Sequence, residues 1–315
     1  MTTTKQFGPQ GWTPERLGSL QGKTYVITGA NAGAGFEATR TLLTKGAKIV
    51  MMNRNAEKSA AAIETLKQEF GGDARVTFVR LDLAVLDSVR QAAAELLETV
   101  PRIDALICNA AIAQVAKQEL TVEGFESQLG VNHFGHFLLC GLLFDRIEES
   151  RGRIVVVGSN AYKMGLKKIQ FEDLNFDQNY TAWNAYAQSK LAQMMFAYEL
   201  QRRVHAAGKQ VQVRVCHPGA SRTNLLNDTA SLPMKMLWKV ISPFIAQSAE
   251  KGSWPEVMCA TEEGLKPQAL YGPTQRVETV GPVGECPLEP LAVNQEAATQ
   301  LWSLSEQKTC YSWSP

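Results

Sequence analysis

Short apolar segments alternate with longer helix-like segments along most of the chain, and this alternation restricts the fold more than any other feature of the sequence. The short segments are rich in β-branched residues, and glycine or proline often follows the longer ones, as expected of strands and helices respectively. The predicted strands are 24–28, 48–52, 75–80, 103–108, 152–157 and 211–215, with 268–270 as a candidate seventh. The predicted helices are 33–45, 56–70, 86–100, 183–207 and, as one long or two broken helices, 124–150.

Strands that alternate with helices of this length form βαβ units, and such units build a parallel sheet that is covered on both faces. We therefore predict an α/β fold: a single, doubly wound Rossmann-type domain over residues 22–272, with about seven strands and with helices on both faces. An N-terminal arm, 1–21, precedes this domain. A tail, 273–315, is expected to pack on the body, because its aromatic residues would be costly to expose.

The composition argues against several classes of protein. The formal net charge is +1, so a nucleic-acid partner is not expected. Residues 1–22 hold no apolar signal-peptide core, and no run approaches the ~18 apolar residues of a membrane span. The six cysteines form no C-x-x-C pair, which favours buried, reduced thiols and a cytoplasmic location.

A glycine-rich loop links the first predicted strand to the first predicted helix. Its sequence, TGANAGAG over 28–35, matches T-G-x-x-x-G-x-G, a pattern expected by chance about 0.01 times in a chain of this composition. Glycines let the backbone turn sharply and approach a pyrophosphate, and a helix N-terminus offers free N–H groups. The alternative is a glycine-rich turn without a ligand, but the position of the loop favours dinucleotide binding.

Two residues that follow neighbouring strands bear on the choice of dinucleotide. Arg54 follows the second strand, where NAD-binding proteins usually place an acid for the ribose 2′-hydroxyl. An arginine there suits a 2′-phosphate and predicts NADP(H), with a solvated surface arginine as the alternative. Asp82 follows the third strand, and it either accepts a hydrogen bond from the adenine amino group or caps the next helix.

Four polar residues form a candidate catalytic set. Tyr186 and Lys190 are four positions apart on a predicted helix and so share one face. Because a Y-x-x-x-K match arises by chance roughly 0.4 times in this chain, its context has to support it. Ser159 at the end of the fifth strand and Asn132 in an apolar helix supply that context. The alternatives are a serine that caps a turn and an amide that bends or caps a helix.

These side chains fit hydride transfer between a carbonyl and an alcohol, which also requires a proton on oxygen. A tyrosine with a pKa near 10 is a poor base, and a neighbouring ammonium is expected to lower that pKa. Ser159 can hold the substrate oxygen beside Tyr186. Asn132 can hold a water that links Lys190 to solvent.

Together these motifs resemble the short-chain dehydrogenase/reductase superfamily over roughly residues 22–272. The glycine loop, Asn109-Ala110-Ala111, the four polar residues and His217-Pro218-Gly219 occur in the order typical of that family. The resemblance implies a catalytic tetrad of Asn132, Ser159, Tyr186 and Lys190, without a metal ion. It also implies cofactor contacts from Gly29, Asn31, Gly33, Gly35, Arg54, Asp82, Asn109, Lys190, Pro218 and Thr223.

Within the superfamily the chain looks most like the retinol dehydrogenase, WW-domain oxidoreductase and protochlorophyllide reductase branch. This likeness rests on VNHFGHFLL over 131–139, on LWSLSE over 301–306 and on the long gap between the catalytic serine and tyrosine. Ala111 replaces the usual glycine of N-A-G. Ala220 replaces the cysteine of the protochlorophyllide enzymes, which argues against a light-driven reaction.

The segment 221–253 is expected to close over the substrate as a lid. It is apolar and rich in methionine, which suits a lipophilic or aromatic substrate because methionine adapts to irregular shapes. Ordinary helix packing, a subunit contact and a membrane surface are the alternatives. The predicted substrate-binding residues are Leu225, Met234, Leu237 and Trp238.

The sequence therefore predicts an NADP(H)-dependent oxidoreductase, a homodimer or homotetramer, that interconverts a carbonyl and an alcohol on a hydrophobic or aromatic small molecule. The alternative is a catalytically silent dinucleotide-binding sensor or scaffold protein of the same fold. Ser159, Tyr186 and Lys190 favour the enzyme, because a protein that only binds has no need of a proton donor.

Overall fold

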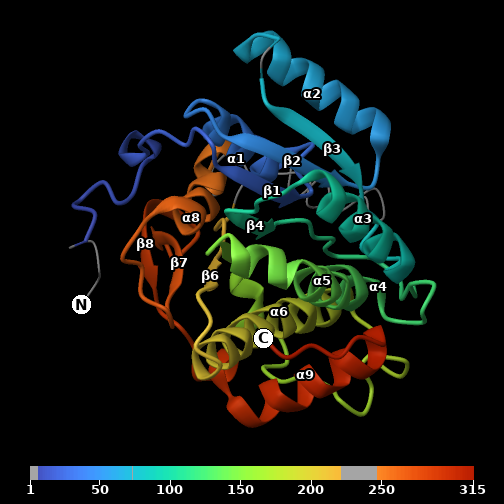
Figure 1. Cartoon of the computed structure of the whole chain (residues 1–315). Coiled ribbons are helices and arrows are strands. Elements are labelled where there is room, and N and C mark those ends of the chain that lie inside the picture. The colour runs from blue at the N-terminus through green and yellow to red at the C-terminus, as the bar shows by residue number, and fades with distance from the viewer. Residues whose placement is uncertain (1–5, 73, 221–246) are drawn as a thin grey trace.

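The computed structural model describes residues 6–72, 74–220 and 247–315, and its centre is one sheet of eight strands (Figure 1). The strand order is β3-β2-β1-β4-β5-β6-β7-β8, and all neighbours are parallel except β7 and β8. The strands are β1 (Thr24–Thr28), β2 (Lys48–Asn53), β3 (Val76–Arg80), β4 (Ala105–Cys108), β5 (Arg153–Val157), β6 (Gln212–Cys216), β7 (Leu270–Gln275) and β8 (Val280–Cys286).

Helices cover both faces of the sheet and enclose two separate apolar cores, so the predicted doubly wound α/β fold is confirmed. In β1 the alternation of side chains sends Val26 to one core and Ile27 to the other. Helices α1, α2 and α8 enclose one core, and α3, α5, α6 and α9 enclose the other. The helices are α1 (Gly33–Leu43), α2 (Ala56–Phe70), α3 (Leu86–Thr99), α4 (Ser127–Leu129), α5 (Gly135–Glu149), α6 (Ala182–Ala206), α8 (Ala249–Thr261) and α9 (Gln295–Thr309).

The sheet extends one strand beyond the seven expected, because β8 returns antiparallel to β7. Its sequence, VGPVGEC, holds two glycines and a proline, a composition typical of loops, so alternation of apolar residues could not reveal it. The expected domain boundary at Gly272 therefore falls inside β7. Positions 249–253 of the expected lid are the first turns of α8.

The rest of the tail packs on the body through aromatic side chains. The ring of Trp302 in α9 lies 5.1 Å from that of Phe137 and 4.9 Å from that of Trp313, and all three side chains are buried. The N-terminal arm is anchored in a similar way, since the fully buried Trp12 donates a hydrogen bond to Glu262 at 2.7 Å. Among the described residues, no helix is both long and apolar enough to cross a bilayer.

Candidate active site

The carboxyl ends of four neighbouring parallel strands meet at one edge of the sheet, and most of the predicted site residues follow them. The glycine loop follows β1 and Asn109 follows β4, while Ser159 and His217 follow β5 and β6. Because β1, β4, β5 and β6 are consecutive neighbours, loops distant in the sequence lie next to one another.

Two asparagine side chains make hydrogen bonds to the backbone of the glycine loop. Asn109 donates from Nδ2 to the carbonyls of Thr28 and Gly29, at 2.8 and 3.2 Å. Asn53 accepts the backbone N–H of Ala30 at 2.6 Å. The sequence did not single out Asn53, although its position at the end of β2 was a signal. The amide of Asn109, predicted as a cofactor contact, thus also supports the loop.

The shape of the loop fits a dinucleotide pyrophosphate. A Cβ on Gly35 would lie 2.5 Å from Nδ2 of Asn109 and 2.7 Å from the carbonyl oxygen of Gly29, so only glycine fits there. Gly29 and Gly33 adopt φ values of 68° and 60°, which favour glycine. No side chain caps the N-terminus of α1, which leaves this helix end available to an anion.

Arg54 and Asp82, which were expected to determine the specificity for NADP(H) or NAD(H), differ in their surroundings. Arg54 is exposed, directly after the buried Asn53. Asp82 accepts the backbone N–H of Ala84 at 3.0 Å in a turn before α3, and it does not cap that helix, whose N-cap is Val85. Asn31 and Pro218 are half-buried. Thr223, Leu225, Met234, Leu237 and Trp238 lie outside the described residues.

The predicted tyrosine and lysine lie side by side on α6, one turn apart. Both are buried, and Nζ of Lys190 lies 5.9 Å from the centre of the Tyr186 ring. Nζ donates to the carbonyl of Val157 at 3.1 Å and to Oε1 of Gln193 at 2.8 Å, which ties α6 to the end of β5. The Ser159 side chain lies near enough to the phenol of Tyr186 to lower its pKa. The structure therefore brings Ser159, Tyr186 and Lys190 together.

Burial determines the protonation of this group more than mutual attraction does. It raises the pKa of Tyr186 to about 12, against a smaller opposing effect of the Ser159 side chain. It lowers the pKa of Lys190 to about 7. The expected lowering of the tyrosine pKa by an ammonium is thus reversed in this structure, because desolvation disfavours both charges. At neutral pH Tyr186 is a protonated phenol.

Asn132 lies in a π-helical turn, Gly130–Phe134, between α4 and α5. Its side chain makes hydrogen bonds to two other segments of the chain. Its Oδ1 accepts from the backbone N–H of Ile112 at 2.9 Å. Its Nδ2 donates to the carbonyl of Ile112 at 3.0 Å and to the Ser189 hydroxyl at 2.9 Å. These bonds use the amide to join the loop after β4 to α6, next to Lys190.

His136 and Gln193 belong to the same polar network, and the sequence analysis missed both. Nδ1 of His136 lies 3.0 Å from the carbonyl of Asn132, so it carries the proton, and Nε2 lies 3.0 Å from the Thr28 hydroxyl. Burial lowers the pKa of His136 to about 4, which keeps the ring neutral. Helical spacing was an available signal, since His136 follows Asn132 by four positions and Gln193 follows Lys190 by three.

Comparison with known proteins agrees with this architecture. Residues 23–171 match the family model of the short chain dehydrogenases. The chain is 38% identical to retinol dehydrogenase 14 of Mus musculus over 301 residues, which cover 92% of this chain and 86% of that protein. It is 35% identical to retinol dehydrogenase 12 of Homo sapiens over 289 residues, which cover 91% and 86%.

Solved structures show the same fold. A crystal structure of an uncharacterized protein from Mycobacterium paratuberculosis superposes with a TM-score of 0.78 at 37% identity, over 96% of this chain and 99% of that one. A short-chain type dehydrogenase/reductase from Mycobacterium marinum superposes with a TM-score of 0.60 at 22% identity, over 79% and 92%. The chain belongs to the short-chain dehydrogenase family, and it is an oxidoreductase of that family that resembles the retinol dehydrogenases.

Lys190 is expected to make the stability of the protein depend on pH. Its pKa is about 7 when folded and 10.5 in the unfolded reference, so between these values the unfolded chain carries the extra proton. The free energy of unfolding should therefore increase as the pH rises from 7 towards 10.5. Between pH 7 and 8.5 this contribution is on the order of 2 kcal/mol.

Urea unfolding of the cofactor-free protein at pH 7 and pH 8.5 measures this effect. Lys190→Met should lose the contribution, whereas the exposed Lys209→Met should keep the pH dependence of the wild type. An unchanged pH dependence in Lys190→Met would contradict the buried, largely neutral lysine.

Proposed function

We propose that the protein is an NADP(H)-dependent oxidoreductase that interconverts a carbonyl and an alcohol on a hydrophobic or aromatic small molecule. The observation that carries the proposal is the buried pair of Tyr186 and Lys190, with the half-buried Ser159 beside it, at the sheet edge that also holds the glycine loop. The retinol dehydrogenase relatives, named for an apolar alcohol, support the same class of substrate.

In the reducing direction Tyr186 acts as the acid. Its phenol is protonated at neutral pH and lies near the Ser159 side chain, so a carbonyl oxygen placed between these hydroxyls receives one hydrogen bond from each. The nicotinamide supplies hydride to the carbonyl carbon when the cofactor is bound. The proton then passes from the phenol to the substrate oxygen, and Lys190, held by Val157 and Gln193, stabilises the resulting phenolate.

An apolar rim around Tyr186 supports a hydrophobic substrate. The rim consists of Met164, Leu166 and Trp183, whose exposed fractions are 62%, 42% and 39%. The Trp183 ring lies 6.4 Å from that of Tyr186. Gly165 packs so closely on α6 that a Cβ there would lie 2.4 Å from that of Ala187, which places the loop beside the tyrosine. Exposed apolar side chains beside a polar reacting group are typical of a binding site.

Tyr186→Phe should abolish turnover and leave cofactor affinity nearly unchanged, because the ring survives and only the proton-transfer group is lost. The measurement is nicotinamide absorbance with hydrophobic aldehydes, ketones and alcohols, beside a cofactor titration by fluorescence. Turnover near the wild-type rate would refute the acid/base assignment. A wild-type protein that binds the cofactor but converts no substrate would favour the sensor or scaffold alternative.

NADP(H) should be preferred over NAD(H) by tenfold or more in kcat/KM, or about 1.4 kcal/mol, because the exposed Arg54 follows β2, where an acid would otherwise select NAD(H). Arg54→Ala should weaken NADP(H) far more than NAD(H). The control is Arg75→Ala, an exposed arginine at the opposite end of the strands, which should leave the ratio unchanged. Equal use of both cofactors by the wild type would exclude this role for Arg54.

Trp183→Ala should lower kcat/KM about tenfold for a bulky apolar substrate and little for a two- or three-carbon aldehyde, because only the larger molecule reaches the rim. Val122→Ala, which removes a side chain that is 82% exposed elsewhere, is the matched control. An equal loss for large and small substrates would show that Trp183 acts on Tyr186 rather than on the substrate.

A further inference from the structure

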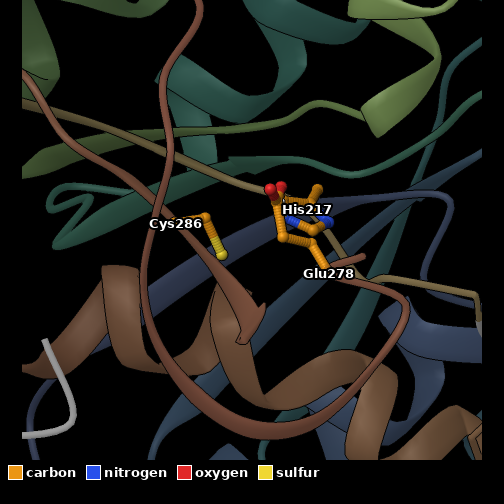
Figure 2. Close-up of side chains that lie close together, drawn as sticks. All are labelled: His217, Glu278 and Cys286. Atoms are coloured by element: carbon orange, nitrogen blue, oxygen red, sulfur yellow. Dashed lines mark ion pairs between the residues drawn. The ribbon is translucent and has the colours of Figure 1, made fainter. Parts of the chain in front are cut away.

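Three buried residues converge behind the Pro218-Gly219 loop: His217, Glu278 and Cys286 (Figure 2). Their potential ligand atoms all lie within 4.8 Å of one another, and Nε2 of His217 lies 3.7 Å from Oε2 of Glu278. Imidazole, carboxylate and thiolate are the ligands that Zn²⁺ prefers. The cluster therefore has to be tested first as a metal site.

The hydrogen bonds around the cluster argue against a metal. Lys163 donates from Nζ to both oxygens of Glu278, at 2.9 and 3.0 Å, so an ammonium already neutralises the carboxylate. Nδ1 of His217 accepts the backbone N–H of Gly219 at 3.2 Å, which leaves the ring proton on Nε2, the atom that faces Glu278. The Glu278 carboxylate thus binds the Lys163 ammonium and faces the Nε2–H group of His217.

Glu278 lies in the turn between β7 and β8, and this turn is strained. Arg276, Val277 and Glu278 have φ values of 48°, 58° and 60°, so three successive residues other than glycine adopt the left-handed conformation. Such residues persist only where the surroundings hold them. The Lys163–Glu278 pair, with its side chains only 16% and 11% exposed, supplies that hold.

The same turn contacts two loops of the proposed active site. Asn160, the residue after Ser159, donates from Nδ2 to the carbonyl of Glu278 at 3.3 Å. Lys163 ends the 3₁₀ turn Asn160–Lys163, which Ser159 caps by accepting the N–H of Ala161 at 3.2 Å. On the other side, the N–H of Ala220 donates to the carbonyl of Thr279 at 2.8 Å. The β7–β8 turn thus connects the two loops: an ion pair joins it to the serine loop, and a backbone hydrogen bond joins it to the loop after β6.

We propose that Glu278 is a positioning residue that acts through Ser159. The Lys163–Glu278 pair latches the strained turn 276–279 onto the 3₁₀ turn that begins after Ser159, and so fixes the serine hydroxyl beside Tyr186. This inference rests on the proposed carbonyl–alcohol chemistry for its kinetic consequence. The latch itself is a feature of the hydrogen-bonded structure and can be tested without turnover.

The kinetic test is a double-mutant cycle of Glu278→Gln with Ser159→Ala, measured as kcat for an accepted substrate. Glu278→Gln should lower kcat at least tenfold in the wild-type background and less than twofold in the Ser159→Ala background, because the residue acts only through the serine. Lys163→Arg should retain activity. Lys266→Met, which breaks the partly exposed pair of Lys266 with Glu285 of β8, should leave kcat unchanged.

Equal losses in both backgrounds would overturn the proposal, as would an unchanged kcat in Glu278→Gln. If Glu278→Gln does not fold, Lys163→Met combined with Glu278→Leu removes the pair without leaving a buried charge, and it should lower kcat by the same factor. One equivalent of Zn²⁺ bound by the wild type in equilibrium dialysis, and lost in Cys286→Ser, would also overturn the latch.

Hydrogen exchange distinguishes failure of the latch from failure of the proposed function. Glu278→Gln should increase amide exchange in 160–164 and 276–280, and Lys266→Met should not. If the wild type converts no substrate but exchange rises as expected, the proposed function is wrong and the latch holds. If exchange in both segments is unchanged, the latch is wrong whatever the activity.

Discussion

The parallel pairing of β1, β4, β5 and β6 is the constraint on which the site depends. It brings four strand ends to one edge, so the glycine loop, Asn109, Ser159 and His217 become neighbours although they are far apart in the sequence. Asn53 and Asn109 then fix the loop backbone to this edge, because each makes hydrogen bonds that the backbone of the turn cannot make within itself. These hydrogen bonds hold the backbone in place, so the polar side chains at this edge keep fixed positions relative to one another.

The burial of Tyr186, Lys190 and His136 at this edge determines their protonation. Desolvation keeps Tyr186 protonated, lowers the pKa of Lys190 to about 7 and holds His136 neutral with a pKa of about 4. The polar groups therefore meet through hydrogen bonds rather than through full charges, which avoids the cost of unpaired ions in the interior. Because its pKa is near 7, Lys190 can gain or lose a proton at neutral pH when a bound ligand brings a charge close to it. A lysine with the ordinary pKa would stay protonated.

The sequence predicted those parts of the fold and site that depend on local patterns. Strand β1 and helix α2 have the predicted bounds, and the Tyr186–Lys190 pair shares a helix face as its spacing implied. Strand β8 was missed because glycine and proline conceal the alternation of its side chains. His136 and Gln193 were missed although each lies one helical turn from a predicted residue, Asn132 or Lys190. Glu278 was missed because its partner, Lys163, lies far away in the sequence on another element, so no spacing identifies it.

The placement of the two loop features suggests how such a scaffold acquires specificity. The proposed tetrad is carried by α6, by the π-helical turn before α5 and by the end of β5, where the backbone is fixed by ladders of hydrogen bonds. Met164 and Leu166 of the apolar rim and the strained turn at 276–279 lie on loops, which can change without disturbing the sheet. The turn keeps its unfavourable conformation because a buried ion pair joins it to the serine loop. A loop that is held in this way can vary in sequence on its exposed side, where Val277 is 85% exposed, while its buried side still aligns the reacting serine.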